Sequence, residues 1–301
     1  MRPELSQAVR LLRANTPEAV DEALALLQNT VFSFSMKLCG HREDAEDTMQ
    51  EVLYRSLRHL ARIDEPRALA VWLYTVTRNR CWRMRKINSH SPQQTLSLDE
   101  LIPGDADLTR LLEDPASGPE DNVLAGERSD QLHHAILRIP PQLRIVLILH
   151  DMEDLPTEDV ARILNLKPGT VRVRLHRARL AVRKELSHPP ESVPAAPPPR
   201  PRPRKKTRRV PAACRELFAN LSEYLDERVE PRTCEEIRRH MEGCPSCIAF
   251  LRDLRGAIDR CRAMSTACDP ALARRLRSIL TREYLRLVEK PLHVNKSVPR
   301  M

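Results

Sequence analysis

A run of prolines near the middle of the chain limits what this sequence can fold into more than any other feature. Residues 188–212 read HPPESVPAAPPPRPRPRKKTRRVPA and contain nine prolines. Proline lacks a backbone N–H and fixes φ, so the run excludes a packed helix and favours extended polyproline conformations. The sequence therefore predicts a linker over residues 188–212, with separately folded parts before and after it.

The folded parts are predicted to be helical. The 301 residues include only seven glycines, and aromatic residues make up 3%. Sandwiches and barrels favour aromatic strands and frequent glycine turns, whereas runs rich in Leu, Ala, Arg and Glu favour helices. We expect an all-α fold: two small helical domains over residues 5–87 and 128–187, an acidic linker over 88–127 between them, and a third small helical domain over 213–290.

The charge of the chain indicates a polyanionic partner. The formal net charge is +9 and the pI is about 9.4, which favours nucleic acid, although an ordinary basic protein would look the same by composition alone. The first residues are too charged for a signal peptide, and no apolar run reaches the about 20 residues that a membrane span needs. We therefore expect a cytoplasmic protein, in which cysteines more often bind metals or act as redox thiols than form disulfides.

The strongest helical pattern begins at Leu155 and reads LPTEDVARILNLKPGTVRVRLHRARLAVRKEL. It predicts a short helix, a break at residues 165–167, and a second helix that begins at Pro168. The second helix carries an apolar stripe at Val171, Leu175, Ala178 and Val182. Two short helices joined by a tight turn, the second with a basic free face, indicate a helix-turn-helix that binds DNA.

The free face of that second helix supplies the expected DNA contacts. Arginine can read guanine with two hydrogen bonds in the major groove, and neighbouring basic residues can hold phosphates. The alternative is an ordinary surface helix with solvated arginines. The candidate DNA-binding residues are Arg172, Val173, Arg174, His176, Arg177 and Arg179.

Two further helices are predicted in the N-terminal part. The segment DAEDTMQEVLYRSLRHL, from Asp44, has an apolar stripe and a polar free face with Asp47, Gln50 and Glu51. The next segment, EPRALAVWLYTVTRNRCWRMRK, places Trp72 among its expected core residues and ends in a basic surface. Candidate DNA-binding residues of this surface are Arg78, Asn79, Arg80, Arg83 and Arg85, although Asn79 has an equal claim to a structural role.

The order of these blocks resembles the extracytoplasmic-function (ECF) sigma factors of bacterial RNA polymerase. The blocks are "AED..QE", "WLY.V.RN…R.RK", an acidic linker and "LP.ED.A.IL.L..GTVR.RLHRAR", and the resemblance covers about residues 20–187. It implies two domains, regions 2 and 4, that bind core RNA polymerase and promoter DNA. By this resemblance, the helix with Asp47, Gln50 and Glu51 would bind the polymerase. The residues from Arg78 to Arg85 would bind the −10 element, and the helix after Pro168 would read the −35 element. The resemblance also implies that the loop at residues 63–66 would capture a flipped base.

A cysteine-rich pattern follows the proline run. His240, Cys244 and Cys247 form H-x3-C-x2-C, and Cys214 lies 26 positions upstream. Three thiolates and one imidazole favour a single tetrahedral zinc ion. Cys214 is the preferred fourth ligand, and Cys234 is the alternative. The spacing is similar to that of the zinc-binding anti-sigma domain, over about residues 212–262, and one more amphipathic helix is expected over 269–288.

Fusion of this domain to the sigma-like part suggests regulation within one chain. A tether raises the effective concentration of the two parts to about millimolar, so even a weak contact between them becomes populated. We expect the tail to modulate the sigma domains in cis, in response to metal or redox state; a tail that only stabilises or docks elsewhere is the alternative. No catalytic constellation is visible, so an enzyme is not expected. The competing function is a stand-alone helix-turn-helix regulator with a metal-sensing or redox-sensing tail.

Overall fold

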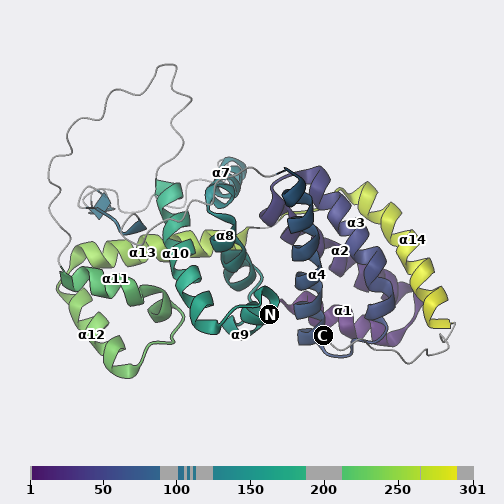
Figure 1. The fold of residues 1–301 in the computed structure, drawn as a ribbon, viewed down its shortest axis with the longest axis horizontal. Helices are drawn as coiled ribbons and strands as arrows, with labels where there is room; N and C mark the ends of the chain where they lie inside the picture. Colours follow the sequence, from purple (N-terminus) through teal and green to yellow (C-terminus); the bar gives the residue numbers. More distant parts are fainter. Residues whose placement is uncertain are drawn as a thin grey trace, which may run out of the picture. The chain divides into compact units, whose positions relative to one another are not determined.

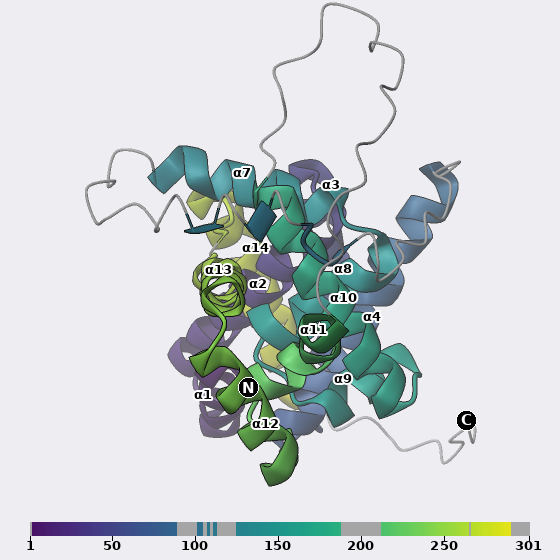
Figure 2. The ribbon, with the colours of Figure 1, turned by 90° about the vertical axis from the view of Figure 1, so that its left-hand side faces the viewer.

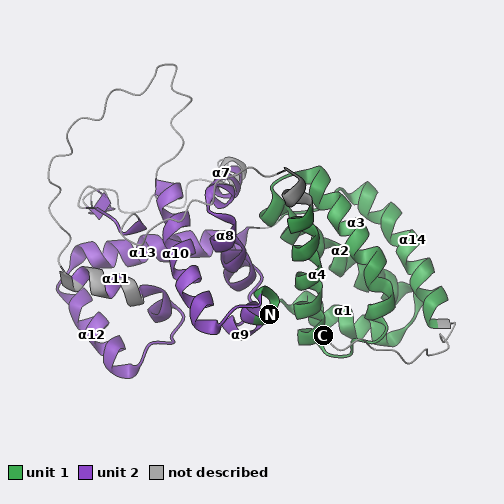
Figure 3. Ribbon diagram, in the orientation of Figure 1, with its two compact units in different colours: residues 1–90, 162–164, 265–301 green, residues 91–161, 165–264 purple. Residues whose placement is uncertain are grey.

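The computed structural model describes residues 2–88, 101–104, 107–108, 111–112, 125–187, 212–264 and 266–289. Within these residues the secondary structure is helical, without strands (Figure 1), which confirms the expected all-α fold. The contacts divide the chain into two units (Figure 3): unit 1 holds residues 1–90, 162–164 and 265–301, and unit 2 holds residues 91–161 and 165–264. The Pro/Arg-rich linker and most of the acidic linker lie outside the described residues.

Unit 1 contains four consecutive helices and the last helix of the chain. Helix α2 packs against both α1 and α3, α4 packs against α2 and α3, and the last helix, α14, packs against α2 and α3. The bounds of the helices are α1 Pro3–Ala14, α2 Pro17–Cys39, α3 Arg42–Leu60, α4 Pro66–Asn88 and α14 Pro270–Glu289.

Unit 2 contains the helix-turn-helix and the cysteine-rich helices. Helix α10 is its centre, because α7, α8, α11 and α13 all pack against it. Figure 2 shows α13 nearly end-on. The bounds are α7 Ala125–Arg138, α8 Pro141–Leu147, the π-helix η1 Ile148–Met152, α9 Thr157–Leu164, α10 Pro168–Ser187, α11 Ala212–Leu225, α12 Pro231–Glu242 and α13 Pro245–Ala263, with the end of α9 counted in unit 1.

Proline sets many of the helix starts. Among the described helices, eight begin at a proline, where the missing N–H removes no hydrogen bond and the fixed φ suits the first turn. Side chains cap some of these starts: Asp269 accepts a hydrogen bond from the Ala271 amide at the start of α14 (2.7 Å). Gly40 ends α2 with a φ of 82°, a left-handed conformation that glycine adopts at little cost. The sharp boundaries of these helices therefore follow from local sequence.

The predicted apolar stripes form the cores. On α10, Val171, Leu175, Ala178 and Val182 are all buried, and the break at residues 165–167 includes Asn165 at a φ of 54°. The stripe of α3 is buried as well. Trp72, expected in the core, is instead half-buried beside His59, with ring centroids 5.0 Å apart. The helical period thus predicted the inward faces of α3 and α10.

Helix α14 differs from the sequence-based expectation. The third domain was predicted to extend to residue 290, which would group α14 with the zinc-binding helices. Instead, the buried side chains Leu280 and Tyr284 belong to a helix that packs against α2 and α3. An amphipathic pattern identifies an apolar face but not the surface that covers it, so the sequence could not give this pairing. In the described part of the chain, no helix combines the length and the apolar character that crossing a bilayer requires.

Candidate metal centre and nucleic-acid interfaces

Four side chains from α11, α12 and the start of α13 converge in unit 2. The ligand atoms of Cys214, His240, Cys244 and Cys247 all lie within 4.8 Å of one another. The Nε2 atom of His240 is 3.5 Å from the sulfur of Cys214 and 3.4 Å from that of Cys247. A tetrahedral zinc site with bonds of about 2.0–2.3 Å separates nitrogen and sulfur ligands by about 3.6 Å, so this arrangement fits one ion. The residues therefore form a candidate metal centre.

Local sequence explains how this centre is assembled. His240 occupies the last turn of α12, and Cys244 is the N-cap residue of α13, which begins at Pro245. This short reversal brings Cys247, one turn into α13, next to His240. The four ligand residues are the set predicted from the spacing, and Cys234, the alternative ligand, is not among the atoms that converge.

A buried arginine joins the helix-turn-helix to the cysteine-rich helices. Arg179 of α10 is 0% exposed and donates hydrogen bonds to both carboxylate oxygens of Asp151 in η1, at 2.8 and 2.6 Å. Its other edge donates to both carboxylate oxygens of Asp226 (3.0 and 2.8 Å) and to the hydroxyl oxygen of Ser222 at the end of α11 (2.8 Å). Such bidentate pairs are the strongest hydrogen bonds between side chains.

The charges of this buried cluster stabilise one another. Burial alone would raise the pKa of Asp151, but the hydrogen bonds from Arg179 and His150 outweigh it and hold the pKa well below its ordinary value. Burial opposes the charge on Arg179 as well, yet its two carboxylate partners raise its pKa. Both groups are therefore ionised at neutral pH, and removal of one partner would leave the others charged and buried.

A second contact of the same kind lies further along α10. The Nε atom of Arg183 donates to Asp253 of α13 (2.6 Å), and its guanidinium lies over the ring of Phe250, 4.8 Å from the ring centroid. Phe250 in turn packs against Phe218 of α11, with centroids 4.7 Å apart. The cysteine-rich helices therefore share a core with the second half of α10.

The first half of α10 keeps the basic face that was predicted to read DNA. Arg172 is exposed, Val173 is 53% exposed, and Arg174 and Arg177 are half-buried. Arg179 and His176 do not belong to this face: both side chains are buried, Arg179 in the ion pairs with Asp151 and Asp226. The sequence period placed these two side chains on the free face because it holds no sign of their burial, which at Arg179 involves Asp226 and Ser222, far along the chain.

The burial of His176 predicts a pH dependence of stability. Burial lowers its pKa to about 4, and the charges of Arg179 and Arg177 act in the same direction. Between pH 4 and about 6.5 the unfolded chain binds this proton and the folded chain does not, so stability falls as the pH drops. From pH 7.5 to 5 the loss is about 2 kcal/mol. Chemical denaturation at both pH values should show a smaller loss for His176→Gln; an equal loss in the variant and the parent chain would contradict the assignment.

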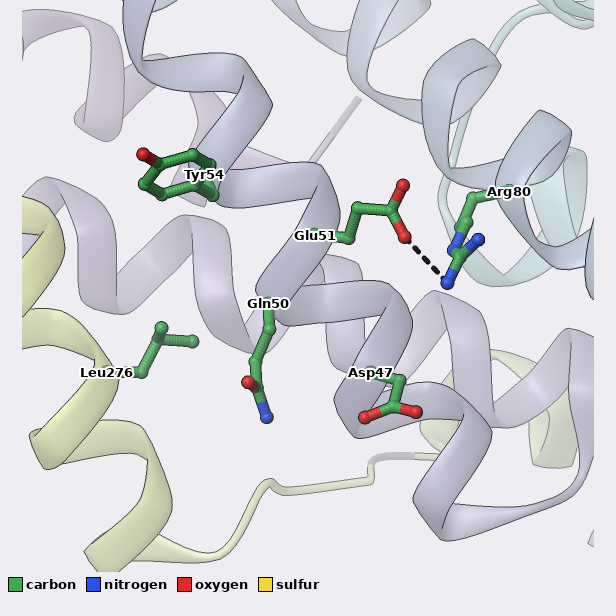
Figure 4. Close-up of a pocket in the computed structure, with 6 residues that line it drawn as sticks. All are labelled: Asp47, Gln50, Glu51, Tyr54, Arg80 and Leu276. Atoms are coloured by element: carbon green, nitrogen blue, oxygen red, sulfur yellow. Dashed lines mark ion pairs between the residues drawn. The ribbon is translucent and has the colours of Figure 1, made fainter.

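In unit 1, the residues predicted to grip the polymerase lie together on α3. Asp47 and Tyr54 are exposed, and Gln50 and Glu51 are half-buried. Figure 4 shows these four side chains around a pocket whose other lining residues are Arg80 of α4 and Leu276 of α14. Glu51 forms an ion pair with Arg80 (2.6 Å). A residue predicted to bind the polymerase is therefore paired with a residue predicted to bind the −10 element.

The basic end of α4 carries the predicted −10 residues. Arg83 is exposed, and Arg78, Asn79 and Arg80 are half-buried; the side chain of Arg85 lies outside the described residues. Sequence reasoning missed Trp82, which is 39% exposed and lies under the guanidinium of Arg78, 5.2 Å from its ring centroid. An exposed aromatic ring within a basic patch can stack on bases, and the sequence RNRCWRMRK already shows this tryptophan among arginines.

Comparison with known proteins finds family matches for three segments of the chain. Family models match at residues 24–89 ("Sigma-70 region 2"), 129–182 ("Sigma-70, region 4") and 214–247 ("Putative zinc-finger"). These three matches cover the N-terminal helices, the helix-turn-helix and the candidate metal centre in turn. The chain thus combines a sigma-70 region 2, a sigma-70 region 4 and a zinc-finger region.

Individual relatives indicate which group of sigma factors this chain resembles. The ECF RNA polymerase sigma factor SigW of Bacillus subtilis is 27% identical over 62% of this chain and 98% of that protein. The RNA polymerase sigma-H factor of Pseudomonas aeruginosa is 28% identical over 60% and 92%, and the ECF sigma factor SigE of Mycolicibacterium smegmatis is 30% identical over 58% and 65%. A structure of the sigma factor RpoE with the anti-sigma factor NepR from Bartonella quintana covers 55% of this chain and 94% of that one, at 20% identity and a TM-score of 0.39. The chain is therefore similar to ECF sigma factors over its two sigma-70 regions and carries a zinc-finger region behind region 4.

Proposed function

We propose that this chain binds core RNA polymerase and directs it to promoters. The single observation that carries the proposal is the presence of both sigma modules in one chain, each with a buried apolar stripe and a basic face that remains accessible. A helix-turn-helix repressor has no need of region 2, so the N-terminal helices argue against the stand-alone regulator.

The promoter contacts are proposed for the accessible basic residues. On α10, Arg172, Val173, Arg174 and Arg177 would read the −35 element, with Val173 suited to a thymine methyl group. On α4, Arg78, Asn79, Arg80 and Arg83 would hold the single-stranded −10 element, with Trp82 as a stacking surface. Asp47, Gln50 and Glu51 of α3 would bind the polymerase.

We further propose that the metal is zinc, bound by Cys214, His240, Cys244 and Cys247. Bound zinc supplies no reaction here; it would hold α11 against the α12–α13 turn, which is a structural role. The cysteine-rich helices contribute only a small apolar core, which they share with α10, and such small units commonly need a metal or a disulfide for stability.

The zinc-binding region is proposed to modulate the sigma domains in cis. The support is its contact with α10: one face of the buried Arg179 binds region 4 through Asp151, and the other binds the tail through Asp226 and Ser222. Loss of metal, or oxidation of the ligand thiols, would disturb α11, and Asp226 directly follows the last residue of that helix. The tail would then respond to metal or redox state through the stability of this contact.

One transcription experiment separates the candidate functions. The full chain is mixed with bacterial core polymerase and a library of double-stranded promoters, and transcript starts are mapped. A sigma factor produces starts at a defined sequence, whereas a repressor only suppresses starts made by another sigma factor. Starts that require this chain support the proposal, and suppression alone would favour the regulator.

The −35 contact predicts a graded effect at Arg172. Arg172→Ala should weaken binding to the preferred promoter about tenfold, since one bidentate base contact provides about 1–3 kcal/mol of discrimination. Arg172→Lys keeps the charge but not the two-pronged geometry, so it should lose sequence preference while retaining part of the affinity. Filter binding of holoenzyme to matched and mismatched −35 sequences measures both. Equal discrimination by all three proteins would remove Arg172 from the reading face.

A further inference from the structure

The turn between α11 and α12 contacts both helices of the helix-turn-helix. Residues 226–228, the brace turn, directly follow the last residue of α11. Asp226 accepts hydrogen bonds from Arg179 of α10. The Nη1 atom of Arg228 donates to the hydroxyl oxygen of Thr157, the first residue of α9 (2.5 Å), although the two residues are 71 positions apart. One short turn of the zinc-binding region is therefore joined to each helix of the DNA-binding motif.

The backbone holds the brace turn in one conformation. The amide of Arg228 donates to the carbonyl of Glu223 (2.9 Å), and the amide of Glu227 donates to that of Tyr224 (3.1 Å). With Glu227 at a φ of 54°, these two bonds form the cap that commonly ends a helix when the next residue is left-handed. Glutamate adopts this conformation at a cost that glycine avoids. The cap reverses the chain at the end of α11, and Arg228 reaches α9 from there.

The partner of Arg228 on α9 is buried. Thr157 is 1% exposed, whereas Arg228 is exposed, so the guanidinium reaches inward from the surface to the start of α9. A hydrogen bond from a charged donor is stronger than one between neutral groups. Asp151, the partner of Arg179 in η1, lies six positions before Thr157. The segment 151–157, which leads into α9, is therefore held at one end by Arg179 and at the other by Arg228.

Helix α9 benefits from such a contact because it is short. It comprises eight residues, and an isolated helix of this length is unstable in water. In helix-turn-helix proteins the first helix crosses the DNA backbone while the second lies in the major groove, so the angle between them sets how the reading residues meet the bases. A binding site must be held within about 0.5 Å of its productive geometry. A contact that fixes the start of α9 therefore affects base recognition without touching DNA.

We propose that Arg228 is a positioning residue for −35 recognition, which acts by holding the start of α9 through Thr157. This inference rests on the proposed promoter function and gives a direction to the effect of the tail on region 4. The brace turn leaves the reading face open, since Arg172 is exposed and Val173 is 53% exposed. The zinc-binding region is then part of the unit that reads the promoter, and its attachment to region 4 favours recognition.

Removal of the arginine tests this role directly. Arg228→Ala should lower the preference for a matched over a mismatched −35 element about fivefold, the effect of one hydrogen bond. Affinity for DNA that lacks a −35 element should stay within about twofold of the parent value, because a positioning residue makes no phosphate contact. The charge control is Arg232→Ala, whose parent side chain is 90% exposed and pairs with Glu236 of its own helix, α12. This control should change neither quantity.

Thr157 allows the same contact to be tested from α9. Thr157→Val removes the hydroxyl that accepts from Arg228, so it should lose as much −35 preference as Arg228→Ala does. Thr157→Ser keeps the hydroxyl and should retain the preference of the parent chain. In the double variant, Arg228→Ala with Thr157→Val, the two losses should not add, because both changes remove one contact.

The measurement is competition binding of holoenzyme, assembled from core polymerase and the full chain, to DNA with matched, mismatched or no −35 element at several salt concentrations. Lower preference with Arg228→Ala and Thr157→Val, but not with Arg232→Ala or Thr157→Ser, is the expected result. Unchanged preference in the first two variants would overturn the inference. An equal loss by Arg228→Ala on all three DNAs, with a smaller salt dependence, would also overturn it, because Arg228 would then be a phosphate contact. If the parent holoenzyme itself shows no −35 preference, the proposed function fails.

Discussion

Replacement of Cys214 by serine is expected to abolish the stoichiometric binding of zinc. The thiolate of Cys214 comes from α11, whereas the other three ligands lie within residues 240–247, so among the four ligands Cys214 is the one that connects α11 to α12 and α13. Structural zinc contributes apparent free energies of about 10–16 kcal/mol in small zinc-finger peptides, and a set of three ligands binds far more weakly. The purified variant should contain less than about a tenth of one zinc per chain after dialysis.

The matched control is Cys234→Ser. Cys234 lies on α12, six positions before His240, but its sulfur is not among the four converging ligand atoms. The variant should therefore retain one zinc, measured by elemental analysis or by release of the metal to a chromogenic chelator. A reversed outcome, with zinc kept by Cys214→Ser and lost by Cys234→Ser, would show that Cys234 is the fourth ligand.

Replacement of Arg179 by methionine is expected to destabilise unit 2 by about 3–5 kcal/mol, the range observed when one partner of a buried ion pair is removed. The loss arises because Asp151 is left charged and buried, and because the hydrogen bonds to Asp226 and Ser222 are lost together. Chemical denaturation followed by circular dichroism measures the total effect. Arg177→Met, a half-buried neighbour on the same helix, should change stability by less than about 0.5 kcal/mol.

The contacts on the two sides of Arg179 can also be tested separately. Asp226→Ala removes the ion pair with the tail but keeps the pair with Asp151 and the hydrogen bond to Ser222, so hydrogen exchange should increase in α11 and α13 while α8 and α9 stay protected. Asp151→Ala should instead increase exchange throughout unit 2. If Asp226→Ala leaves exchange in α11 and α13 unchanged, the ion pair between Asp226 and Arg179 does not hold the tail to region 4.

Much of this structure follows from patterns that a single sequence displays. The stripe at Val171, Leu175, Ala178 and Val182 fixes the inward face of α10 because residues three and four apart share a side of a helix. Prolines at helix starts and Gly40 at a helix end fix the boundaries. The spacing H-x3-C-x2-C gives three of the four converging ligands directly, because a single turn suffices to bring them together.

Other features could not be predicted, for a common physical reason. Arg179 has the charge and the helix position expected of a DNA-contacting residue. It is buried in ion pairs because Asp226 and Ser222, more than forty positions later in the chain, pack against it. Likewise, the pattern of α14 indicates an apolar stripe but not that α2 and α3 cover it. Long-range partners are set by shape and charge in three dimensions, which the local period of a sequence does not record.

The most direct test of the central claim is opening of a double-stranded promoter. Core polymerase is incubated with the full chain on a promoter selected by transcript mapping, and unpaired thymines are detected with permanganate. We expect reactive thymines just upstream of the transcript start only when core polymerase and the chain are both present, and weaker reactivity with Arg172→Ala. A duplex that stays closed with both proteins, while another sigma factor opens its own promoter with the same polymerase, would contradict the account.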